Sequence, residues 1–239
     1  MQLNSKQILS IVLSVIVYTY LVNYNFAFAF VLAVGFHEVG HLWIAKKLGY
    51  QTGGLYIWPF IGGTAFVTDH YKSYNHKVIV ALMGPFWGAL LATVTTVIGY
   101  YSVSPLIISI GFWMSIMNIF NLLPLGFLDG GQVLESYAYS INKKLGIVAY
   151  IVSSILAFIF LINLNPFLAF VFIVLGWGAV INKCNDWNNP HLPHTRLTIK
   201  QGLLNGLFYL VIVAILYFNL LLALKVQSLN QMNHALFGG

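Results

Sequence analysis

The chain has 239 residues, of which 59% are hydrophobic and only 7% are charged. A soluble domain carries about 25% charged residues, so this composition excludes a soluble globular protein and indicates an integral membrane protein. The single cysteine, Cys184, excludes an internal disulfide and a four-cysteine zinc site. The formal net charge of +6 comes from basic residues at the ends of apolar runs, which membrane topology explains better than nucleic-acid binding.

The order of apolar runs predicts an all-α polytopic membrane protein with about seven transmembrane helices. A bilayer-crossing helix needs about 20 apolar residues. The candidate runs are 7–23, 26–45, 78–101, 105–123, 145–163, 166–182 and 202–224. The breaks between them carry turn and helix-start signals, such as Ser104-Pro105 and Asn165-Pro166.

Residues 49–76 do not resemble a span, because Gly and Pro interrupt two short apolar runs. This pattern predicts a small membrane-associated β-hairpin or a re-entrant loop on the cytoplasmic side. A strand edge there could pair with an extended substrate. A plain connecting loop is the simpler alternative.

Basic residues predict the orientation. If the seven runs all cross the bilayer, ten of the eleven Lys and Arg residues fall on one side, and only Lys225 falls on the other. The positive-inside rule therefore predicts a cytoplasmic N-terminus. The Asn- and Lys-rich composition points to a bacterial cell membrane.

The second apolar run contains the sequence His37-Glu38-Val39-Gly40-His41. Two His at positions i and i+4 share one face of a helix and can bind Zn²⁺ through their imidazoles. Glu38 between them can take the proton of a water held by the metal. Ionisable groups at membrane depth are costly and are functional candidates by default. The motif therefore predicts a metalloprotease that works inside a bilayer, near the cytoplasmic face because Lys46 follows His41 closely.

A catalytic zinc usually has three protein ligands, so a third ligand must come from elsewhere in the chain. Among the five acids, Asp129 stands out because it follows Asn121-Leu-Leu-Pro124-Leu-Gly126 and precedes a Gly pair. Non-helical backbone at membrane depth is tolerated where it is buried in protein or lines a wet cavity. The alternative is that Asp129 is only a helix N-cap.

Together, the His37–His41 motif and the Asn121-x-x-Pro124-x-x-x-x-Asp129-Gly motif resemble the site-2 protease family of intramembrane zinc metalloproteases. The resemblance covers about residues 26–142, which we expect to be the catalytic core. Residues 1–25 would be an N-terminal transmembrane helix, and residues 143–239 would hold C-terminal transmembrane helices and a cytoplasmic loop.

Two weaker features fit the same family. Ile61-Gly62-Gly63 resembles the Gly-Gly element of the family's β-hairpin. The segment from Ala81 to Gly88 resembles the Gly-Pro element of its third core helix, although Gly88 stands where Asn is common.

The resemblance implies a role for each matching residue. His37, His41 and Asp129 would be the zinc ligands, and Glu38 would be the general base. The substrate would be a transmembrane segment of a single-span membrane protein in the lipid bilayer, with no nucleic acid involved.

Substrate contacts are also implied. Asn121 would contact the substrate or the developing oxyanion, and Gly62 and Gly63 would bind substrate through the hairpin. Asn118 lies one turn before Asn121 and either faces the site or makes a helix–helix hydrogen bond.

Two other classes of function remain open. Zinc-transporter helices also use HExxH-like clusters, but they need further acidic or His residues along an ion path, and only Asp129 is available here. A catalytically silent membrane binding protein is the second alternative, and the intact set of His37, Glu38, His41 and Asp129 argues against it.

Overall fold

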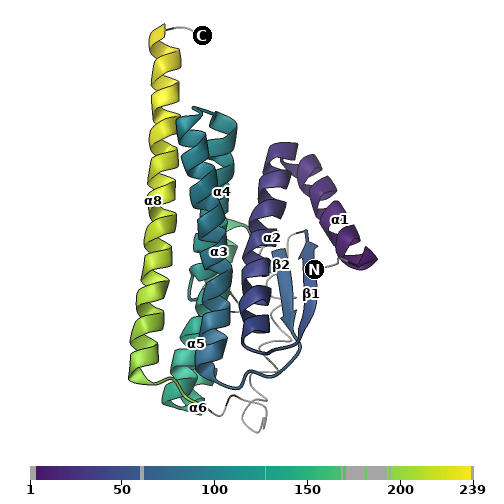
Figure 1. Cartoon of the computed structure of the whole chain (residues 1–239), viewed down its shortest axis with the longest axis vertical. Helices are drawn as coiled ribbons and strands as arrows, with labels where there is room; N and C mark the ends of the chain where they lie inside the picture. The colour runs from purple at the N-terminus through teal and green to yellow at the C-terminus, as the bar shows by residue number, and fades with distance from the viewer. Residues whose placement is uncertain are drawn as a thin grey trace.

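The computed structural model describes residues 4–59, 62–126, 128–167, 169–170, 181, 193 and 195–237. Within these ranges the chain is mostly helical and carries one two-stranded sheet (Figure 1). The elements are α1 (Ser5–Leu21), α2 (Tyr24–Lys47), β1 (Thr52–Trp58), β2 (Gly62–Val67), α3 (Tyr74–Tyr101), α4 (Pro105–Leu122), α5 (Asp129–Ile141), α6 (Lys143–Leu164) and α8 (Ile199–Phe237). The predicted helical architecture with a small β-hairpin is confirmed.

Four helices of the described residues are long and apolar enough to cross a membrane: Tyr24–Lys47, Tyr74–Tyr101, Lys143–Asn163 and Ile199–Val226. Two further apolar helices, Ser5–Leu21 and Leu106–Leu122, are shorter. The predicted span 166–182 lies mostly outside the described residues. The helices support an integral membrane protein, and the total of seven spans stays a prediction.

Side-chain caps mark where several helices begin. In α1, α2, α3, α4 and α6 an Asn or Ser side chain accepts a backbone N–H of the first turn, through Asn4, Asn23, Ser73, Ser104 and Asn142. The first N–H groups of a helix have no partner within the helix, and leaving them unpaired is costly near lipid. These polar residues therefore fix the breaks that interrupt the apolar runs.

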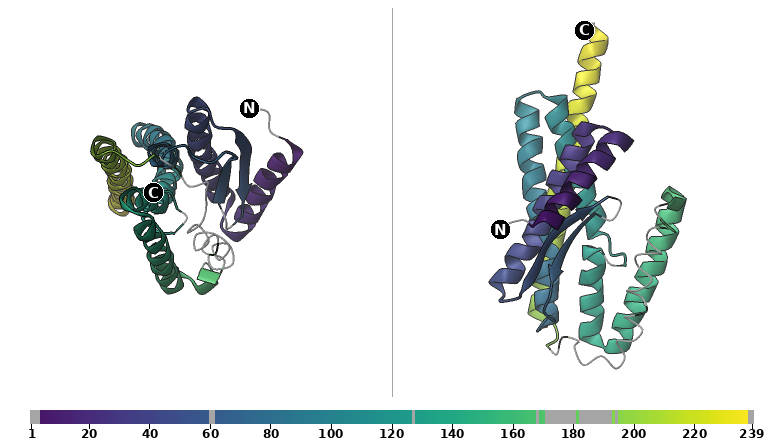
Figure 2. Two further views of the ribbon diagram at one scale, coloured as in Figure 1. Left: turned by 90° about the horizontal axis from the view of Figure 1, so that it is seen from below. Right: turned by 90° about the vertical axis from the view of Figure 1, so that its right-hand side faces the viewer.

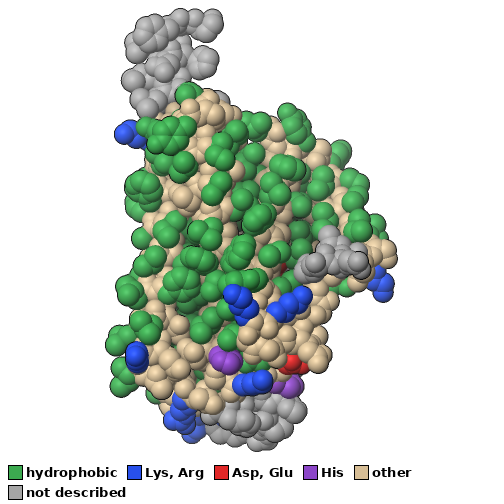
Figure 3. Space-filling view, viewed as in Figure 1, with side chains coloured by type: hydrophobic (Ala, Val, Ile, Leu, Met, Phe, Trp, Pro, Cys, Tyr) green, Lys and Arg blue, Asp and Glu red, His purple; other side chains and the backbone are tan. Residues whose placement is uncertain are grey.

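Helix α3 is the centre of the bundle, since it packs against α2, α4, α5 and α8. Its buried face supplies Val78, Leu82 and Ala89 to the main core, where Met114 of α4 and Ile212 of α8 meet them. Figures 1 and 2 show α8 on one flank of the bundle and the hairpin with α1 on the opposite flank. Hydrophobic side chains cover most of the face in Figure 3, and Lys and Arg gather towards one end of it.

The hairpin lies between α1 and α2. Its strands are antiparallel, with Ile57 opposite Gly63, and the buried side chains of Leu55 and Ile57 pack against Val34 and Leu42 of α2. The prediction of a hairpin rather than a plain loop is thus confirmed. This packing holds β2 over the motif-bearing part of α2.

The outer edge of β1 is covered by α1. The Ser14 hydroxyl donates to the Ile57 carbonyl at 2.8 Å, and the Ile57 N–H donates to the Ser10 hydroxyl at 3.2 Å. Two Ser side chains therefore replace a neighbouring strand at this position. Of the two strands, β2 is the one whose outer edge α1 does not cover.

Candidate metal centre

The two His of α2 lie one turn apart and point to the same place. Their Nε2 atoms are 3.0 Å apart, and both side chains are buried within the bundle. The spacing of four residues puts both rings on the helix face that looks towards α3, α4 and α5. Two of the predicted ligands are thus aligned by local geometry alone.

Asp129 is brought to the same place from the beginning of α5. Its Oδ2 lies 2.9 Å from His37 Nε2, and its Oδ1 lies 3.4 Å from His41 Nε2. Asp129 is also buried. The N-cap residue of α5 is Leu128, which makes no side-chain capping bond, so the carboxylate of Asp129 faces the His pair rather than capping the helix.

These distances fit a zinc ion. Zn–N bonds are about 2.0–2.1 Å and Zn–O bonds about 2.0–2.2 Å, so neighbouring ligand atoms of a tetrahedral site are about 3.3–3.5 Å apart. The three distances between ligand atoms here, 3.0, 2.9 and 3.4 Å, are close to this expected ligand–ligand distance. Ligand atoms of His37, His41 and Asp129 all lie within 4.8 Å of one another. Two imidazoles and one carboxylate also match a donor set used by catalytic zinc.

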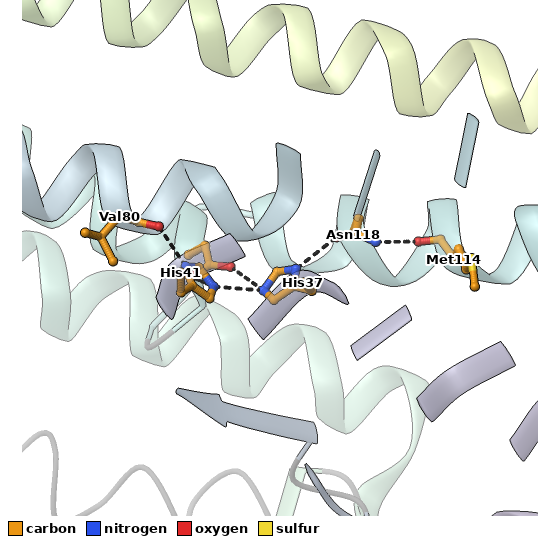
Figure 4. A network of polar contacts seen from close by, with 6 residues as sticks. His37, His41, Val80, Met114 and Asn118 are labelled. Atoms are coloured by element: carbon orange, nitrogen blue, oxygen red, sulfur yellow. Dashed lines mark hydrogen bonds and ion pairs between the residues drawn. The ribbon is translucent and has the colours of Figure 1, made fainter. Parts of the chain in front are cut away.

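The outer ring nitrogens of both His have hydrogen-bond partners (Figure 4). His37 Nδ1 lies 2.9 Å from Asn118 Oδ1, and His41 Nδ1 lies 2.7 Å from the Val80 carbonyl oxygen. Both partners accept, so each Nδ1 carries the proton and donates it. Each Nε2 then presents a lone pair to the shared centre, as a metal ligand must.

Glu38 is buried on α2 beneath the hairpin. A Cβ atom at Gly63 of β2 would lie closer than 3.0 Å to the Glu38 side chain and to Val34. Because glycine has no Cβ, Gly63 lets the strand cross directly over the Glu38 carboxylate. This contact puts the predicted base and the predicted substrate-binding strand side by side.

Comparisons with known proteins agree with this architecture. A family model described as peptidase family M50 matches residues 25–112. The zinc metalloprotease MJ0392 of Methanocaldococcus jannaschii is 27% identical over 159 residues, which cover 62% of this chain and 46% of that protein. Rip3 of Mycobacterium tuberculosis, named a putative zinc metalloprotease, is 28% identical over 115 residues, which cover 43% of this chain and 28% of that protein.

The fold has a solved counterpart. The site-2 protease from Methanocaldococcus jannaschii superposes with a TM-score of 0.52 at 22% identity, covering 74% of this chain and 88% of that chain. Residues 25–112 thus match peptidase family M50, and the fold resembles that of a solved site-2 protease. It spans less than half of the length of the curated relatives named above. Zinc is the metal in the names of these relatives, and it is the metal that the cluster of His37, His41 and Asp129 fits.

Close backbone contacts set the position of Asp129, the predicted third ligand. Between α4 and α5 the chain turns through Gly126, whose φ of +50° lies in the left-handed region that favours glycine. Cβ atoms at Gly130 and Gly131 would collide with the carbonyl oxygens of Leu122 and Gly126. The glycines thus let α5 begin against the end of α4, which sets the position of Asp129.

A buried ion pair ties α5 to α3. Lys77 Nζ lies 3.0 Å from Glu135 Oε1, and the two side chains are 12% and 3% exposed. Glu135 is six residues after Asp129, about 9 Å along the helix. Sequence analysis did not single out Lys77. Lys77 and Glu135 are 58 positions apart, so no local sequence pattern predicts that they pair.

Two glycines of α3 make room for His41 and for Asn118, the hydrogen-bond partner of His37. The sequence alone did not predict this role. A Cβ at Gly84 would collide with the His41 imidazole, and a Cβ at Gly88 would collide with the Asn118 amide. Small residues four positions apart are a known device for close helix packing in membranes. The four-residue spacing of Gly84 and Gly88 was the sequence signal for this close packing. The contact with Asn118 explains why position 88 is a glycine.

The remaining predicted site residues are Asn121 and Gly62. Asn121 occupies the last turn of α4 and is half-buried. Gly62 opens β2 with a φ of +89° and lies opposite Trp58. Their contacts with a substrate stay predictions.

Proposed function

We propose that this chain is a zinc-dependent intramembrane metalloendopeptidase. It would cleave transmembrane segments of single-span membrane proteins near the cytoplasmic face, with residues 26–142 as its catalytic core. The observation that carries the proposal is the convergence of three buried side chains from two distant helices, His37, His41 and Asp129, beside the buried Glu38. Buried ionisable groups at membrane depth are expensive to maintain without a function.

His37, His41 and Asp129 would hold the ion through two nitrogens and a carboxylate oxygen. When bound, zinc supplies a Lewis acid that lowers the pKa of water towards about 7 and polarises a carbonyl. The protein's own part is to keep both Nε2 lone pairs directed inward through the Asn118 and Val80 contacts. Rigid outer contacts of this kind preserve ligand geometry.

Glu38 would move the proton. A carboxylate oxygen of Glu38 accepts a proton from the attacking water, and the resulting carboxylic acid donates it to the departing amine nitrogen. The peptide C–N bond breaks, and the water oxygen becomes part of the new carboxylate. Burial beneath β2 keeps Glu38 in a site of low water content, where its interactions with reacting groups are strong.

The hairpin would present the substrate. An extended segment can add to an exposed sheet edge through backbone hydrogen bonds. Because α1 covers the edge of β1 through Ser10 and Ser14, β2 is the strand we assign to this role. Gly63 leaves the strand without a side chain next to Glu38, and Gly62 leaves open space beside it, so a scissile bond could approach closely. Asn121 would then contact the substrate or the oxyanion.

We place the N-terminus in the cytoplasm of a bacterial cell. A topology reporter fused after Lys47 or Lys144 should then be cytoplasmic, and one fused after Lys225 should be extracytoplasmic. The opposite labelling would invert this topology and put the metal centre near the other face.

The function is tested by Glu38→Gln, which keeps the side-chain shape but removes the proton acceptor. Zinc content should stay at the wild-type level, while cleavage falls by at least about 10²–10⁴-fold. Membrane proteomes of cells with the wild type and with the variant should differ by an uncut single-span protein. A variant that binds zinc and cleaves at the wild-type rate would rule out the role of Glu38.

A further inference from the structure

We propose that Asn118 is a positioning residue of the metal centre. Its amide would hold the His37 ring in the tautomer and orientation that present Nε2 to the metal, and Gly88 would supply the space that the amide needs. The proposal rests on the proposed function at one point only, namely that the cluster binds zinc.

The orientation of the Asn118 amide follows from its two contacts. One end lies 2.8 Å from the Met114 carbonyl oxygen, which can only accept a hydrogen bond. That end must therefore be the NH₂ group, and the opposite end, facing His37 Nδ1 at 2.9 Å, must be the carbonyl oxygen. His37 thus donates to Asn118, and Asn118 donates to Met114; Figure 4 shows these two contacts in line.

This direction fixes the His37 tautomer. With an acceptor opposite Nδ1, the proton is on Nδ1 and the lone pair is on Nε2. Nε2 is the atom that lies 2.9 Å from Asp129 Oδ2 and 3.0 Å from His41 Nε2. An imidazole without the Asn118 contact could carry its proton on Nε2 or rotate away. Loss of such an outer contact typically weakens metal binding by about 10–100-fold.

Gly88 is the second half of the arrangement. Asn118 is 1% exposed, in the contact zone between α3 and α4. A Cβ at Gly88 would overlap the Asn118 amide. A larger residue at 88 would therefore push the amide out of line with His37. Position 88 therefore acts on His37 through Asn118: it leaves space for the amide, and the amide accepts the hydrogen bond from His37.

The test measures zinc affinity of the purified full-length chain by competition with a chromophoric chelator, together with thermal unfolding of the zinc-free protein. Asn118→Ala should raise the zinc Kd by about 10–100-fold. Asn118→Asp should recover part of the affinity, because one carboxyl oxygen accepts from Nδ1 and the other, when protonated, donates to the Met114 carbonyl in place of the NH₂ group. Ser115→Ala is the matched control. Ser115 is buried on the same helix, and among the described residues its hydroxyl donates only to the Gly111 carbonyl of that helix, so the Kd should not change.

A double-mutant cycle separates positioning from general packing. Gly88→Ala should raise the zinc Kd in the wild-type background and should have no further effect on it once Asn118 is Ala. A wild-type Kd for Asn118→Ala, or an equal loss for Asn118→Ala and Asn118→Asp, would overturn the proposal while leaving the zinc site intact. Failure of the unmodified chain to bind zinc would instead overturn the proposed function, and the positioning role with it.

Discussion

The candidate metal centre combines His37 and His41 of α2, which we call the α2 arm, with Asp129 of α5, the α5 arm. The two arms are positioned by different kinds of contact. On α2, His37 and His41 are aligned by the pitch of one uninterrupted helix, and neighbouring helices supply only the outer contacts to Asn118 and Val80. The place of each His on the helix therefore depends on local sequence, whereas the orientation of each ring depends on one contact with α4 or α3.

The α5 arm depends on distant parts of the chain. Asp129 is the first residue of a 13-residue helix that has no side-chain cap. Its location is set by contacts of Gly130 and Gly131 with backbone carbonyls and by the Lys77–Glu135 ion pair with α3. A ligand supplied in this way is easier to displace, because no continuous helix connects it to the first two.

The largest effect should follow from removing the α5 ligand. Asp129→Ala leaves two His and no carboxylate, so zinc affinity should fall steeply and cleavage should vanish even with excess zinc. If Asp129 only supported the helix, the cost would be about 0.5–2 kcal/mol of stability, with zinc near one per chain. Zinc content after dialysis, together with cleavage of a co-expressed single-span reporter protein, distinguishes the two.

Asp69→Ala is the control for this experiment. Asp69 accepts a backbone N–H of Gln51 next to the hairpin and should leave zinc content unchanged. Zinc uptake by sealed vesicles tests the transporter alternative on the same variants, because a transporter would show altered flux and no proteolysis. Retained zinc with retained cleavage in Asp129→Ala would remove Asp129 from the ligand set.

A smaller but substantial effect should come from the ion pair that holds α5. Lys77→Met removes the ion pair of the buried Glu135 carboxylate, which typically costs about 3–5 kcal/mol when a buried pair is broken. The melting temperature should drop, and zinc affinity should drop with it. The double variant Lys77→Met/Glu135→Met should recover most of the stability, because two apolar groups leave no unpaired charge. No recovery in the double variant would show that the charges matter for more than their pairing.

The same contrast explains what the sequence could and could not predict. The helical architecture, the hairpin and the His pair follow from local patterns: long apolar runs, a Gly-rich break and a four-residue spacing. Asp129 was identifiable because few acids exist in the chain and because Gly and Pro surround this one. Lys77 was not, since its partner Glu135 is distant in sequence. The covering of β1 by Ser10 and Ser14 likewise depends on how α1 packs.

The smallest predicted effects compare Gly130 of the α5 arm with Gly84 of α3, which lies against His41 of the α2 arm. Gly130→Ala would press a Cβ against the Leu122 carbonyl, which is backbone and cannot move alone, so α5 should shift and stability should fall by about 1–3 kcal/mol. Gly84→Ala would press against the His41 imidazole, a side chain that can rotate. We therefore expect Gly84→Ala to weaken zinc binding with less loss of stability.

Gly35 supplies the matched control for both. It lies on α2 two residues before His37, and a Cβ there would meet only Ile57 Cδ1 at 3.9 Å, an ordinary contact. Gly35→Ala should leave zinc affinity unchanged and could raise stability by up to about 1 kcal/mol, because Ala favours a helix interior. Chelator competition and thermal unfolding of the three variants provide the comparison. If Gly130→Ala retained both zinc affinity and stability, the α5 arm would not depend on close backbone contact, and the distinction between the arms would fail.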